Sequence, residues 1–477
     1  GMLDFDSAGG TQQIQKDVYI LKGEEVEVYE PRFTWHGFRY VEITGYPGEP
    51  KPEDVLGRVV NSDVEIVGQF ECSNPMINQI QKNYVWTQLS NLHGGVPGDC
   101  PHRERLGYTG DGHVTAEACM LNFDMATFYT KWLDDISDAQ NKKTGFVPHT
   151  APFYGGGVGP AWGCAYIIIA WYMYLYYEDT EVLKDHYDGM KMWIEYLTSR
   201  TDGDYIVHRE EPGSWFLGDW CTPDEISLPP ELVSTYYYYI VADIMARVAD
   251  ILNHDHDAEY FRKLCQRISE AFNVQFFDEA NMKYSIGRQG ANVFPLAADI
   301  VPDEYKLDLL DSLIKDIICR GYRFDTGIFA TPLTIKVLTD HGREDIAYKM
   351  LTNCTYPGYG YMIAKGATTL WENWNGQASH NHPMFGSVSA WFYKTLAGIN
   401  IDCRYPGFER IVFKPCFLEE LDWAKASMNT IRGKVFIGWK RVGNDLKVIL
   451  EIPVNCSARL YLPESCATNK AIYESNT

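Results

Sequence analysis

A helical period is the feature that most constrains this chain, because it continues from about Asn74 to about Gly398 of the 477 residues. Within 114–140, apolar side chains recur at steps of three and four and form one stripe: Leu121, Met125, Phe128, Trp132 and Ile136. Comparable stripes lie at about 75–92, 162–178, 181–199, 231–253, 257–275, 303–319, 327–339, 343–353 and 383–397. The pattern predicts ten or more paired helices, with charge and tryptophan in the Gly- and Pro-rich connections. We expect a ring of helical hairpins whose loops build a site at one end.

Alternating patterns flank the helical region on both sides. From about residue 16 to 69, β-branched and aromatic residues alternate between Gly and Pro breaks, which is typical of strands. Alternation returns after Pro406, in 435–439 and 446–452, on either side of a turn at 443–445. Three units are therefore predicted: an N-terminal β region at 1–72, a helical unit at 73–402 and a C-terminal β domain at 403–477.

The balance of charge and aromatic residues narrows the class of ligand. Trp, Tyr and Phe make up 14% of the chain, and such a surplus commonly lines sites for sugars or bases. A net charge of −22 would repel a phosphate backbone, and no run of basic residues offsets it. A carbohydrate is therefore favoured, and nucleic acid is not expected as a partner.

Neither a disulfide framework, a metal site nor a membrane span is expected. The twelve cysteines are scattered without a CxxC pair, which is typical of buried small hydrophobes. His380 and His382 have no third ligand spaced to join them, so no metal or other cofactor is expected. The longest apolar run, 167–177, ends at Glu178 and Asp179 and predicts a buried helix.

The compartment and the oligomeric state stay open at this stage. No secretory leader is recognisable, but Gly1-Met2 resembles a cloning remnant ahead of a start codon, so a leader could have been removed. The acidic composition mainly implies solubility, and both a cytoplasmic and a periplasmic location stay open.

The stretch GDCPHRERLGYTGD at 98–111 holds three carboxylates and two arginines among three glycines and a proline. A solvated loop that caps the next helix through Asp111 is the ordinary interpretation of such a stretch. However, Leu106 and Tyr108 are apolar and lie between two strongly apolar helices, so part of the loop must face inward.

A second unusual loop, GATTLWENWNG at 366–376, places Glu372 between Trp371 and Trp374. A glutamate among tryptophans is desolvated, which raises a carboxyl pKa unless a cation or hydrogen bonds compensate. Two acids in separate aromatic loops fit glycoside hydrolysis, in which one protonates the leaving oxygen and the other activates water or attacks the sugar.

The stretch DCPHRERLGYTGD closely resembles the signature of the α-L-rhamnosidases of glycoside hydrolase family 78, where it is paired with a WENW-like element. YEPRFTWHGFRYVEITG resembles that family's preceding β domain, PAWGCAY and GDW fall at the expected intervals, and HNHPMFGSVSAWFYKTLAGI resembles its closing helix. The resemblance covers the chain from about residue 26 to the end. It implies a mainly α fold, an (α/α)6 barrel or six-hairpin toroid, with a short N-terminal β region and a small C-terminal β-sandwich domain.

The resemblance also implies an activity: inverting hydrolysis that removes terminal α-L-rhamnose, with Glu104 as general acid and Glu372 as general base. It implies that the sugar is held by a set of polar and aromatic side chains: Asp99, Arg103, Tyr108, Asp111, Trp162, Trp215, Trp220 and His382. A 6-deoxy sugar needs acceptors for its hydroxyls and an apolar wall for its methyl group, and this set offers both. Because Glu104 must carry a proton, at least one of the flanking arginines, Arg103 or Arg105, is expected to point away from it.

Three departures from the family pattern bear on these expectations. Tyr108 stands where the family usually has tryptophan, and Cys164 stands where small or acidic residues are common. The stretch DFDSAGGTQQIQKDVYILKG at 4–23 resembles the middle of a β domain, so we expect either a truncated or a reduced member of the family. This departure affects the expected glycan preference more than the chemistry.

Two alternatives stay open. One is an (α/α)6-barrel glycosidase or phosphorylase that acts on another sugar, although a phosphorylase would need a phosphate pocket in place of Glu372. The other is a catalytically inactive sugar-binding homologue, against which the presence of both Glu104 and Glu372 argues. An inverting mechanism predicts that the two carboxyl groups face each other at about 6.5–9.5 Å, whereas about 5–5.5 Å would indicate retention.

Overall fold

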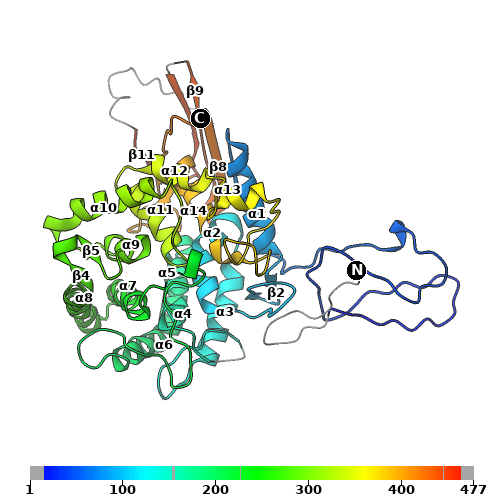
Figure 1. The fold of residues 1–477 in the computed structure, drawn as a ribbon, viewed down its shortest axis with the longest axis horizontal. Helices are drawn as coiled ribbons and strands as arrows, with labels where there is room; N and C mark the ends of the chain where they lie inside the picture. Colours follow the sequence, from blue (N-terminus) through cyan, green and yellow to red (C-terminus); the bar gives the residue numbers. More distant parts are fainter. Residues whose placement is uncertain (1–14, 153–155, 226, 444, 463–477) are drawn as a thin grey trace.

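Helices dominate the computed structural model, which describes residues 15–152, 156–225, 227–443 and 445–462 (Figure 1). The helices of the central unit are, in chain order, α1 (Pro75–Leu89), α2 (Thr109–Asn122), α3 (Ala126–Ala139), α4 (Pro160–Gly163), α5 (Ala165–Tyr177), α6 (Thr180–Ser199), α7 (Pro230–Ile251), α8 (Asp255–Phe276), α9 (Gln289–Ala297), α10 (Lys306–Cys319), α11 (Ala330–Asp340), α12 (Glu344–Thr352), α13 (Tyr359–Ala364) and α14 (Val388–Trp391), which continues as a π-helical turn, η6 (Phe392–Ala397).

The inner helices form a closed ring. Each inner helix contacts the next one in the order α2, α5, α7, α9, α11 and α14. The ring closes because α14 also packs on α2. The helices between them in sequence lie outside: α3 and α6 pack on α5, and α8 packs on α7. The fold is therefore the (α/α)6 barrel that the sequence predicts.

Side-chain patterns explain which helices lie inside and which lie outside. The inner helix α5 is apolar on all sides and carries the run at 167–177, most of which is buried as predicted, while Trp171, Tyr172, Tyr174 and Tyr177 are partly exposed. The outer helix α8 buries one face whose residues are spaced by three and four: Ala258, Phe261, Leu264, Ile268, Phe272 and Phe276. No helix in the described ranges is long and apolar enough to cross a membrane.

The single helix expected over 114–140 is two helices. Phe123 ends α2 in an extended conformation, with φ −131° and ψ 152°, because its backbone forms an isolated β-bridge with Ile66. The apolar stripe continues across this break, and Phe128, Trp132 and Ile136 are buried on α3. The helices α9 and α13 were not expected, because both are short and α9 contains Pro295.

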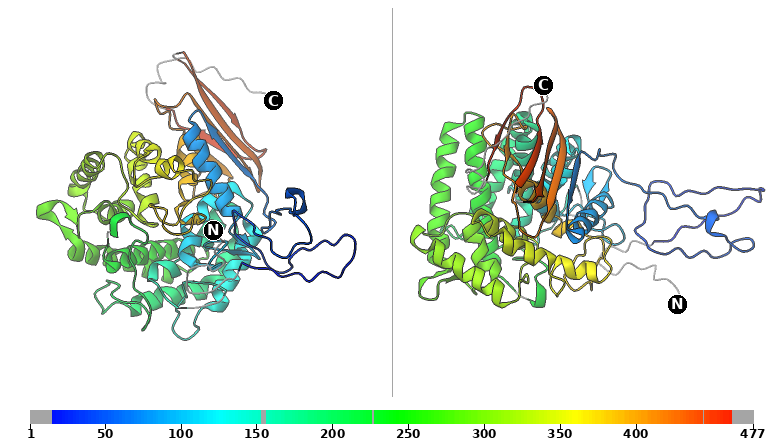
Figure 2. Two further views of the ribbon diagram at one scale, coloured as in Figure 1. Left: turned by 45° about the vertical axis from the view of Figure 1, so that its right-hand side comes forward. Right: turned by 90° about the horizontal axis from the view of Figure 1, so that it is seen from above.

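Two sheets stand at one edge of the barrel (Figure 2). The first has the order β1-β8-β9-β10 and is antiparallel, with strands Gly68–Cys72, Trp423–Thr430, Gly433–Val442 and Asp445–Glu451. The second has the order β11-β7-β6, with strands Ser457–Leu460, Arg410–Phe413 and Ile399–Ile401. The alternation in 435–439 is confirmed, because Val435, Ile437 and Trp439 are all buried. Asn444, in the predicted turn, lies outside the described residues.

Short strand pairs occur in the barrel connections: β2 (Leu92–His93) with β3 (Val96–Pro97), and β4 (Phe277–Asp278) with β5 (Lys283–Tyr284). Trp439 of β9 joins the sheet to the barrel by donating its indole N–H to the Leu396 carbonyl at 2.8 Å.

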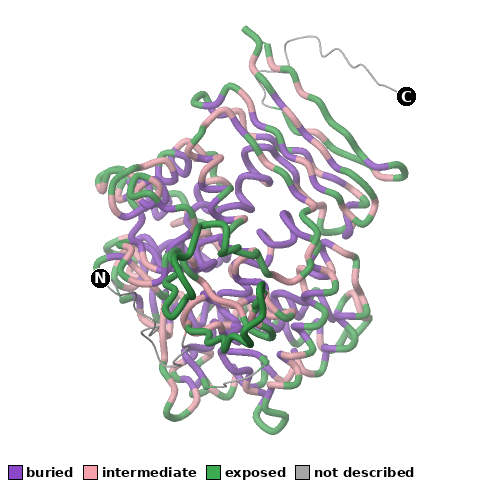
Figure 3. Tube along the Cα trace, turned by 90° about the vertical axis from the view of Figure 1, so that its right-hand side faces the viewer, coloured by how far each residue is buried: buried purple, intermediate pink, exposed green. Residues whose placement is uncertain are grey.

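The N-terminal segment differs from the prediction. Residues 15–67 are largely extended, but no strand is assigned within them, and they project from the barrel (Figures 1 and 2). A strand needs a continuous series of backbone hydrogen bonds to a neighbouring strand, and in the described part of this segment such pairing is limited to its end, where Ile66 forms an isolated bridge with Phe123. Apolar side chains that alternate in the sequence, such as Val18, Ile20 and Val28, are therefore exposed (Figure 3).

Candidate active site

The loop that carries Glu104 is closed by Asp99. The Asp99 backbone N–H donates to the Leu106 carbonyl at 3.0 Å, and the Leu106 N–H donates to Asp99 Oδ1 at 2.9 Å. The helix α2 then begins at Thr109, earlier than the predicted start near Val114. Asp111 therefore lies in the first helical turn and does not cap the helix, contrary to the ordinary interpretation of this stretch.

Glycines in this stretch allow α2 to begin directly against two tryptophans. A Cβ atom on Gly110 would clash with the indole of Trp162, and one on Gly112 would clash with Trp132. Because neither glycine has a side chain, the first turn of α2, which carries Asp111, packs directly on the two buried indoles.

The loop that carries Glu372 folds back on itself. The Glu372 N–H donates to the Ser379 carbonyl at 2.8 Å, and the Ser379 N–H donates to Glu372 Oε2 at 3.0 Å. The flanking indoles are fixed separately: Trp371 stacks on His380 with ring centroids 4.6 Å apart, and Trp374 donates to the Thr326 carbonyl at 3.0 Å. Glu372 is consequently 9% exposed and held in one place.

Arg103 brings the two acid loops together. Its Nη2 lies 2.8 Å from Glu372 Oε2, and its Nε lies 3.4 Å from Glu104 Oε1. Burial raises the pKa of Glu372, but the charges of His382 and Arg103 and hydrogen bonds from the Ser379 backbone and Arg103 lower it below its usual value overall. Arg103 is thus a cation that offsets the effect of burial on the pKa of Glu372, as expected for a carboxylate between two tryptophans.

Arg105 contacts Trp35 rather than Glu104. The sequence predicted that at least one of the two flanking arginines would point away from this acid. The Arg105 guanidinium lies over the ring of Trp35, 5.3 Å from the centroid, and burial lowers its pKa. It makes no ion pair with any of the described residues.

Asp99 and Asp111 form a buried acidic pair on the other side of Glu104. Burial, together with the charge of Glu104, raises the pKa of Asp99 to about 7. Burial and the charges of Asp99, Glu372 and Glu104 raise the pKa of Asp111 well above its usual value. Burial and these charges thus favour the protonated form of Asp111, which can donate a hydrogen bond.

His382 faces Asp111, with Nδ1 3.4 Å from Asp111 Oδ1. Burial lowers the pKa of His382 to about 4, so the imidazole is neutral near pH 7. Neither of these two atoms has a hydrogen-bond partner among the described residues. Both are therefore buried polar atoms whose hydrogen-bonding capacity the described residues do not use.

Tyr108 directs its hydroxyl to Glu104. Burial raises the pKa of Tyr108, and so do the charge of Glu104 and a hydrogen bond with its carboxylate. The ring stacks on His149, with centroids 5.4 Å apart. Of the two acids nearest in sequence, Glu104 rather than Asp111 is thus the partner of the phenol.

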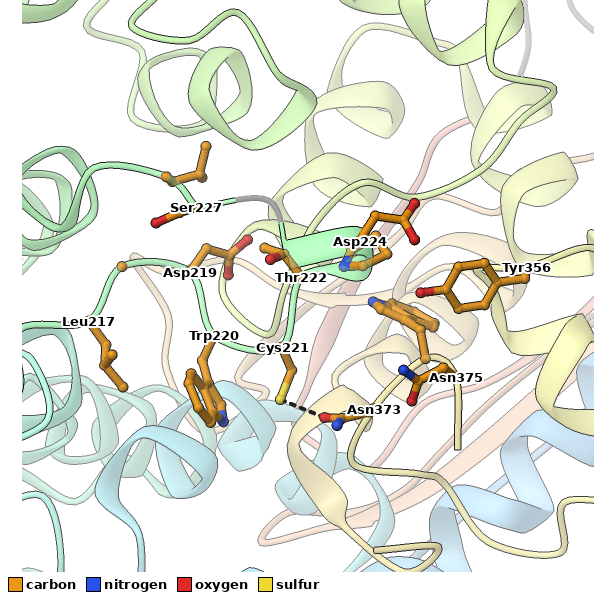
Figure 4. Close-up of a pocket in the computed structure, with 14 residues that line it drawn as sticks. Leu217, Asp219, Trp220, Cys221, Thr222, Asp224, Ser227, Tyr356, Asn373 and Asn375 are labelled. Atoms are coloured by element: carbon orange, nitrogen blue, oxygen red, sulfur yellow. Dashed lines mark hydrogen bonds between the residues drawn. The ribbon is translucent and has the colours of Figure 1, made fainter. Parts of the chain in front are cut away.

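A cavity of about 640 Å³ opens beside the Glu372 loop (Figure 4). Trp220 and Cys221 line it on one side, and Asn373 and Trp374 line it on the other. The Cys221 thiol donates to Asn373 Oδ1 at 3.0 Å and joins the two walls. The volume is sufficient for a small sugar.

The barrel of this chain matches a known family of glycosidase domains. The family model described as the bacterial α-L-rhamnosidase six-hairpin glycosidase domain matches residues 65–396. The chain belongs to this family. The models of the bacterial α-L-rhamnosidase C-terminal domain and concanavalin-like domain match residues 398–474 and 3–61.

Relatives of the chain include α-L-rhamnosidases. One from Streptomyces avermitilis is 36% identical over 94% of this chain, which covers 43% of that protein. A solved α-L-rhamnosidase described as from Dictyoglumus thermophilum is 43% identical with a TM-score of 0.86, over 91% of this chain and 50% of that one. The S. avermitilis enzyme complexed with L-rhamnose is 34% identical with a TM-score of 0.85, over 93% of this chain and 43% of that one. The chain spans about half the length of the curated relatives it matches.

The three tryptophans predicted to wall the sugar pocket have different surroundings in this family member. Trp220 lines the cavity and is 40% exposed, whereas Trp162 is buried beside Gly110. Trp215 is 66% exposed, and its backbone N–H donates to the Gly157 carbonyl. Their contacts with a sugar stay a prediction.

Asp219 and Cys221 are two site residues that the sequence reasoning missed. Asp219 lies in the GDW element and accepts hydrogen bonds from backbone N–H groups at Gly327, Phe329 and Ala330. Cys221 was expected to be a buried small hydrophobe, but it bonds to Asn373 in the cavity wall. Both partners are more than a hundred residues away, so only the structure reveals these bonds.

The histidines and cysteines show no metal or disulfide arrangement in the described ranges. No group of three His, Cys, Asp or Glu there is placed to hold a metal ion, and the cysteines there are free. His380 lies 2.8 Å from the Gly376 carbonyl, away from His382. Exposed cysteines also occur, at Cys319, Cys354 and Cys403, so the expectation of buried cysteines holds only in part.

Proposed function

We propose that the protein is an inverting glycoside hydrolase that removes terminal α-L-rhamnose from glycosides or polysaccharides, with Glu104 as general acid and Glu372 as general base. The observation that carries the proposal is that Arg103 contacts both carboxylates, although Arg103 and Glu372 are 269 residues apart in sequence. The similarity to proteins named α-L-rhamnosidase, one of them solved with L-rhamnose, supports the choice of sugar.

In the proposed reaction, Glu104 donates its proton to the glycosidic oxygen as the C–O bond breaks. Glu372 accepts a proton from water as that water attacks the anomeric carbon from the opposite face, so the sugar is released with inverted configuration. The hydrogen bonds from Ser379 and Arg103 keep Glu372 ionised, which is the state that a base requires.

The remaining residues are proposed to hold the sugar. Asp111 and His382 present polar atoms to its hydroxyls, with Asp99 and Arg103 completing the polar side. The three tryptophans, Trp162, Trp215 and Trp220, together with Tyr108, supply the aromatic wall against which the C6 methyl group packs.

The shared guanidinium sets an upper limit on the spacing of the two acids. Because it is planar and rigid, the nearest oxygens of Glu104 and Glu372 lie no more than about 8 to 9 Å apart. This limit is compatible with the spacing of about 6.5–9.5 Å that leaves room for water and equally with the spacing of about 5–5.5 Å of a retaining enzyme, so the stereochemistry needs its own test. Inversion itself is tested by following the anomer that forms first, using proton NMR on an aryl α-L-rhamnoside. Initial release of the α anomer would contradict the proposal.

The roles of the two acids are tested with leaving groups of different quality. Glu104→Gln is expected to reduce kcat/KM by several orders of magnitude on an alkyl α-L-rhamnoside and by much less on a nitrophenyl one, because a good leaving group needs little protonation. Glu372→Gln is expected to reduce both alike. Equal losses for Glu104→Gln on both substrates would contradict the acid assignment.

The sugar is tested separately with a panel of nitrophenyl glycosides. The α-L-rhamnoside is expected to be cleaved in preference to the α-L-arabinoside, α-L-fucoside and α-D-mannoside. Preference for another member of the panel would overturn the sugar assignment but not the roles of the acids.

A further inference from the structure

We infer that Trp35, in the segment that precedes the barrel, is a positioning residue for the active site. It holds Arg105 away from Glu104 and fixes the outer side of the loop at 98–106, without touching the substrate. The inference rests on the proposed role of Glu104 as the general acid.

The ring of Trp35 lies between the barrel and the acid loop. It stacks on His93 of β2, with centroids 4.2 Å apart and planes inclined by 20°. The same ring is contacted by the Arg105 guanidinium at 5.3 Å, in the geometry of a cation–π interaction. Trp35 thus connects the residue directly after Glu104 to a fixed part of the barrel.

The backbone beside Trp35 also packs closely on the acid loop. A Cβ atom on Gly37 would lie 2.9 Å from Pro101 Cγ and 3.0 Å from the His102 backbone nitrogen. This turn is itself anchored, because the Gly37 N–H donates to Gln15 Oε1 at 2.9 Å. Residues 35–37 consequently form a wall behind the stretch that presents Glu104.

Arg105 needs such a wall because of its backbone. Its φ of 57° lies in the left-handed region, which is unfavourable for a non-glycine residue and persists only where neighbours enforce it. This conformation turns the Arg105 side chain towards Trp35 and away from the preceding residue.

Five charged or titratable side chains already interact with Glu104. Asp99, Arg103, Tyr108, Asp111 and His149 all interact with it. Without Trp35, the half-buried guanidinium of Arg105 loses its cation–π contact, and the carboxylates of the same loop can attract it. A second cation at Glu104 would favour the ionised carboxylate and disturb its orientation, and both effects impair a general acid.

The loop is therefore held from two sides. Arg103 connects its inner side to Glu372, and the segment at 35–37 supports its outer side. The supporting segment lies in an exposed, extended part of the chain that crosses in front of the barrel in Figure 3. The region ahead of the barrel thus contributes to the geometry of the acid.

Hydrogen exchange tests this support independently of any activity. Trp35→Ala is expected to raise amide exchange of peptides covering 98–108 by about tenfold or more, because the loop loses its outer contact. Phe38→Ala is the matched control, since Phe38 lies in the same segment and is 59% exposed. Unchanged exchange in 98–108 for Trp35→Ala, or the same rise in Phe38→Ala, would overturn the inference.

Kinetics test the consequence for the acid. Trp35→Ala is expected to lower kcat roughly 10- to 100-fold on an alkyl α-L-rhamnoside and distinctly less on a nitrophenyl one, with KM within about twofold. Trp35→Phe keeps an aromatic face and should retain most of the rate, and Arg105→Gln added to Trp35→Ala should recover part of it. A loss that is equal on both substrates, or confined to KM, would overturn the inference.

The two proposals can fail separately. If the parent protein cleaves no α-L-rhamnoside, the proposed function fails, while the exchange experiment still decides whether Trp35 holds the loop. If the parent is active and Trp35→Ala matches it in exchange and in kinetics, only the role of Trp35 is wrong.

Discussion

Asp111 and Glu372 show how two acids in one small site are given opposite pKa shifts. Burial and the charges of Asp99, Glu372 and Glu104 raise the pKa of Asp111 well above its usual value. Glu372 is nearly as buried, but Arg103 and the Ser379 N–H keep its pKa below the usual value. A divergence of this kind between acids is typical of acid–base sites.

The hydroxyl of Tyr108 is expected to contribute to the reaction rate. Tyr108→Phe removes the hydroxyl that bonds to Glu104 and keeps the ring that stacks on His149. Transition-state stabilisation should fall by about 0.5–1.5 kcal/mol, the usual net contribution of one hydrogen bond, measured as kcat/KM on an aryl α-L-rhamnoside. Tyr108→Trp should also lower the rate, by disturbing the stack. If Phe equals the parent and Trp exceeds it, the tyrosine acts only as a smaller aromatic wall.

At the scale of elements, the start of α11 depends on a carboxylate from a distant loop. Asp219 accepts the N–H groups of Gly327, Phe329 and Ala330 at 2.6, 2.9 and 3.2 Å, and so satisfies donors at the beginning of the helix. The same contact fixes the loop that bears Trp220 and Cys221 in the cavity wall. One side chain thus joins an inner helix to the site.

Asp219→Ala is therefore expected to destabilise the protein by about 2 kcal/mol, because three donors in a buried place lose their acceptor. Asp219→Asn is the matched variant: it keeps one oxygen acceptor and should lose less. Chemical denaturation monitored by tryptophan fluorescence measures both. Equal stability of the alanine variant and the parent would show that the helix start does not need this cap.

The elements that the sequence predicted correctly are those whose pattern is complete in one local stretch. The stripes of α3, α6 and α8 contain their full period, so the helices are evident without the structure. The break at Phe123 was not predictable, because it depends on a bridge to Ile66 outside the helix. The strands expected in 16–67 failed for the same reason, since pairing requires a partner that local alternation does not supply.

In the candidate site, too, local sequence features were predictable and contacts between distant segments were not. The chemical types of Glu104 and Glu372, and their resemblance to a known signature, could be recognised in the sequence. The sharing of Arg103 between them, and the bond from Cys221 to Asn373, join loops far apart along the chain and required coordinates.

At the scale of the whole molecule, the three matched regions are joined by contacts that cross between them. The strand β1 precedes the barrel but pairs with β8 in the C-terminal sheet. Phe70 of that strand stacks on Phe392 at the end of the barrel, at 5.3 Å. Together with the packing of 35–37 on the acid loop, these contacts connect the barrel to the regions before and after it.

Buried titratable groups couple the stability of this assembly to pH. Burial raises the pKa of Asp325 to about 6, with a further rise from the charge of Asp316 and an opposing effect of Arg320. An aspartate pKa raised on folding means that the folded state binds more protons between about pH 4 and 6. The stability from this group is therefore complete below about pH 4 and is lost as the pH rises through about 6. His113 and His382, with pKa values lowered to about 3 and 4, act in the opposite direction below about pH 6.5.

A difference between variants isolates the contribution of Asp325, because the histidines are common to both proteins. Asp325→Asn removes the titration, so the free energy of unfolding of the variant relative to the parent should rise by about 2 kcal/mol between pH 4.5 and pH 8. The absolute offset at either pH includes the effect on Gln289, whose side chain accepts from the Asp325 N–H, but the change with pH does not. Urea denaturation of both proteins at the two pH values measures it. A difference that is constant with pH, or that falls as the pH rises, would mean that the Asp325 carboxyl titrates with no upward shift in the folded protein.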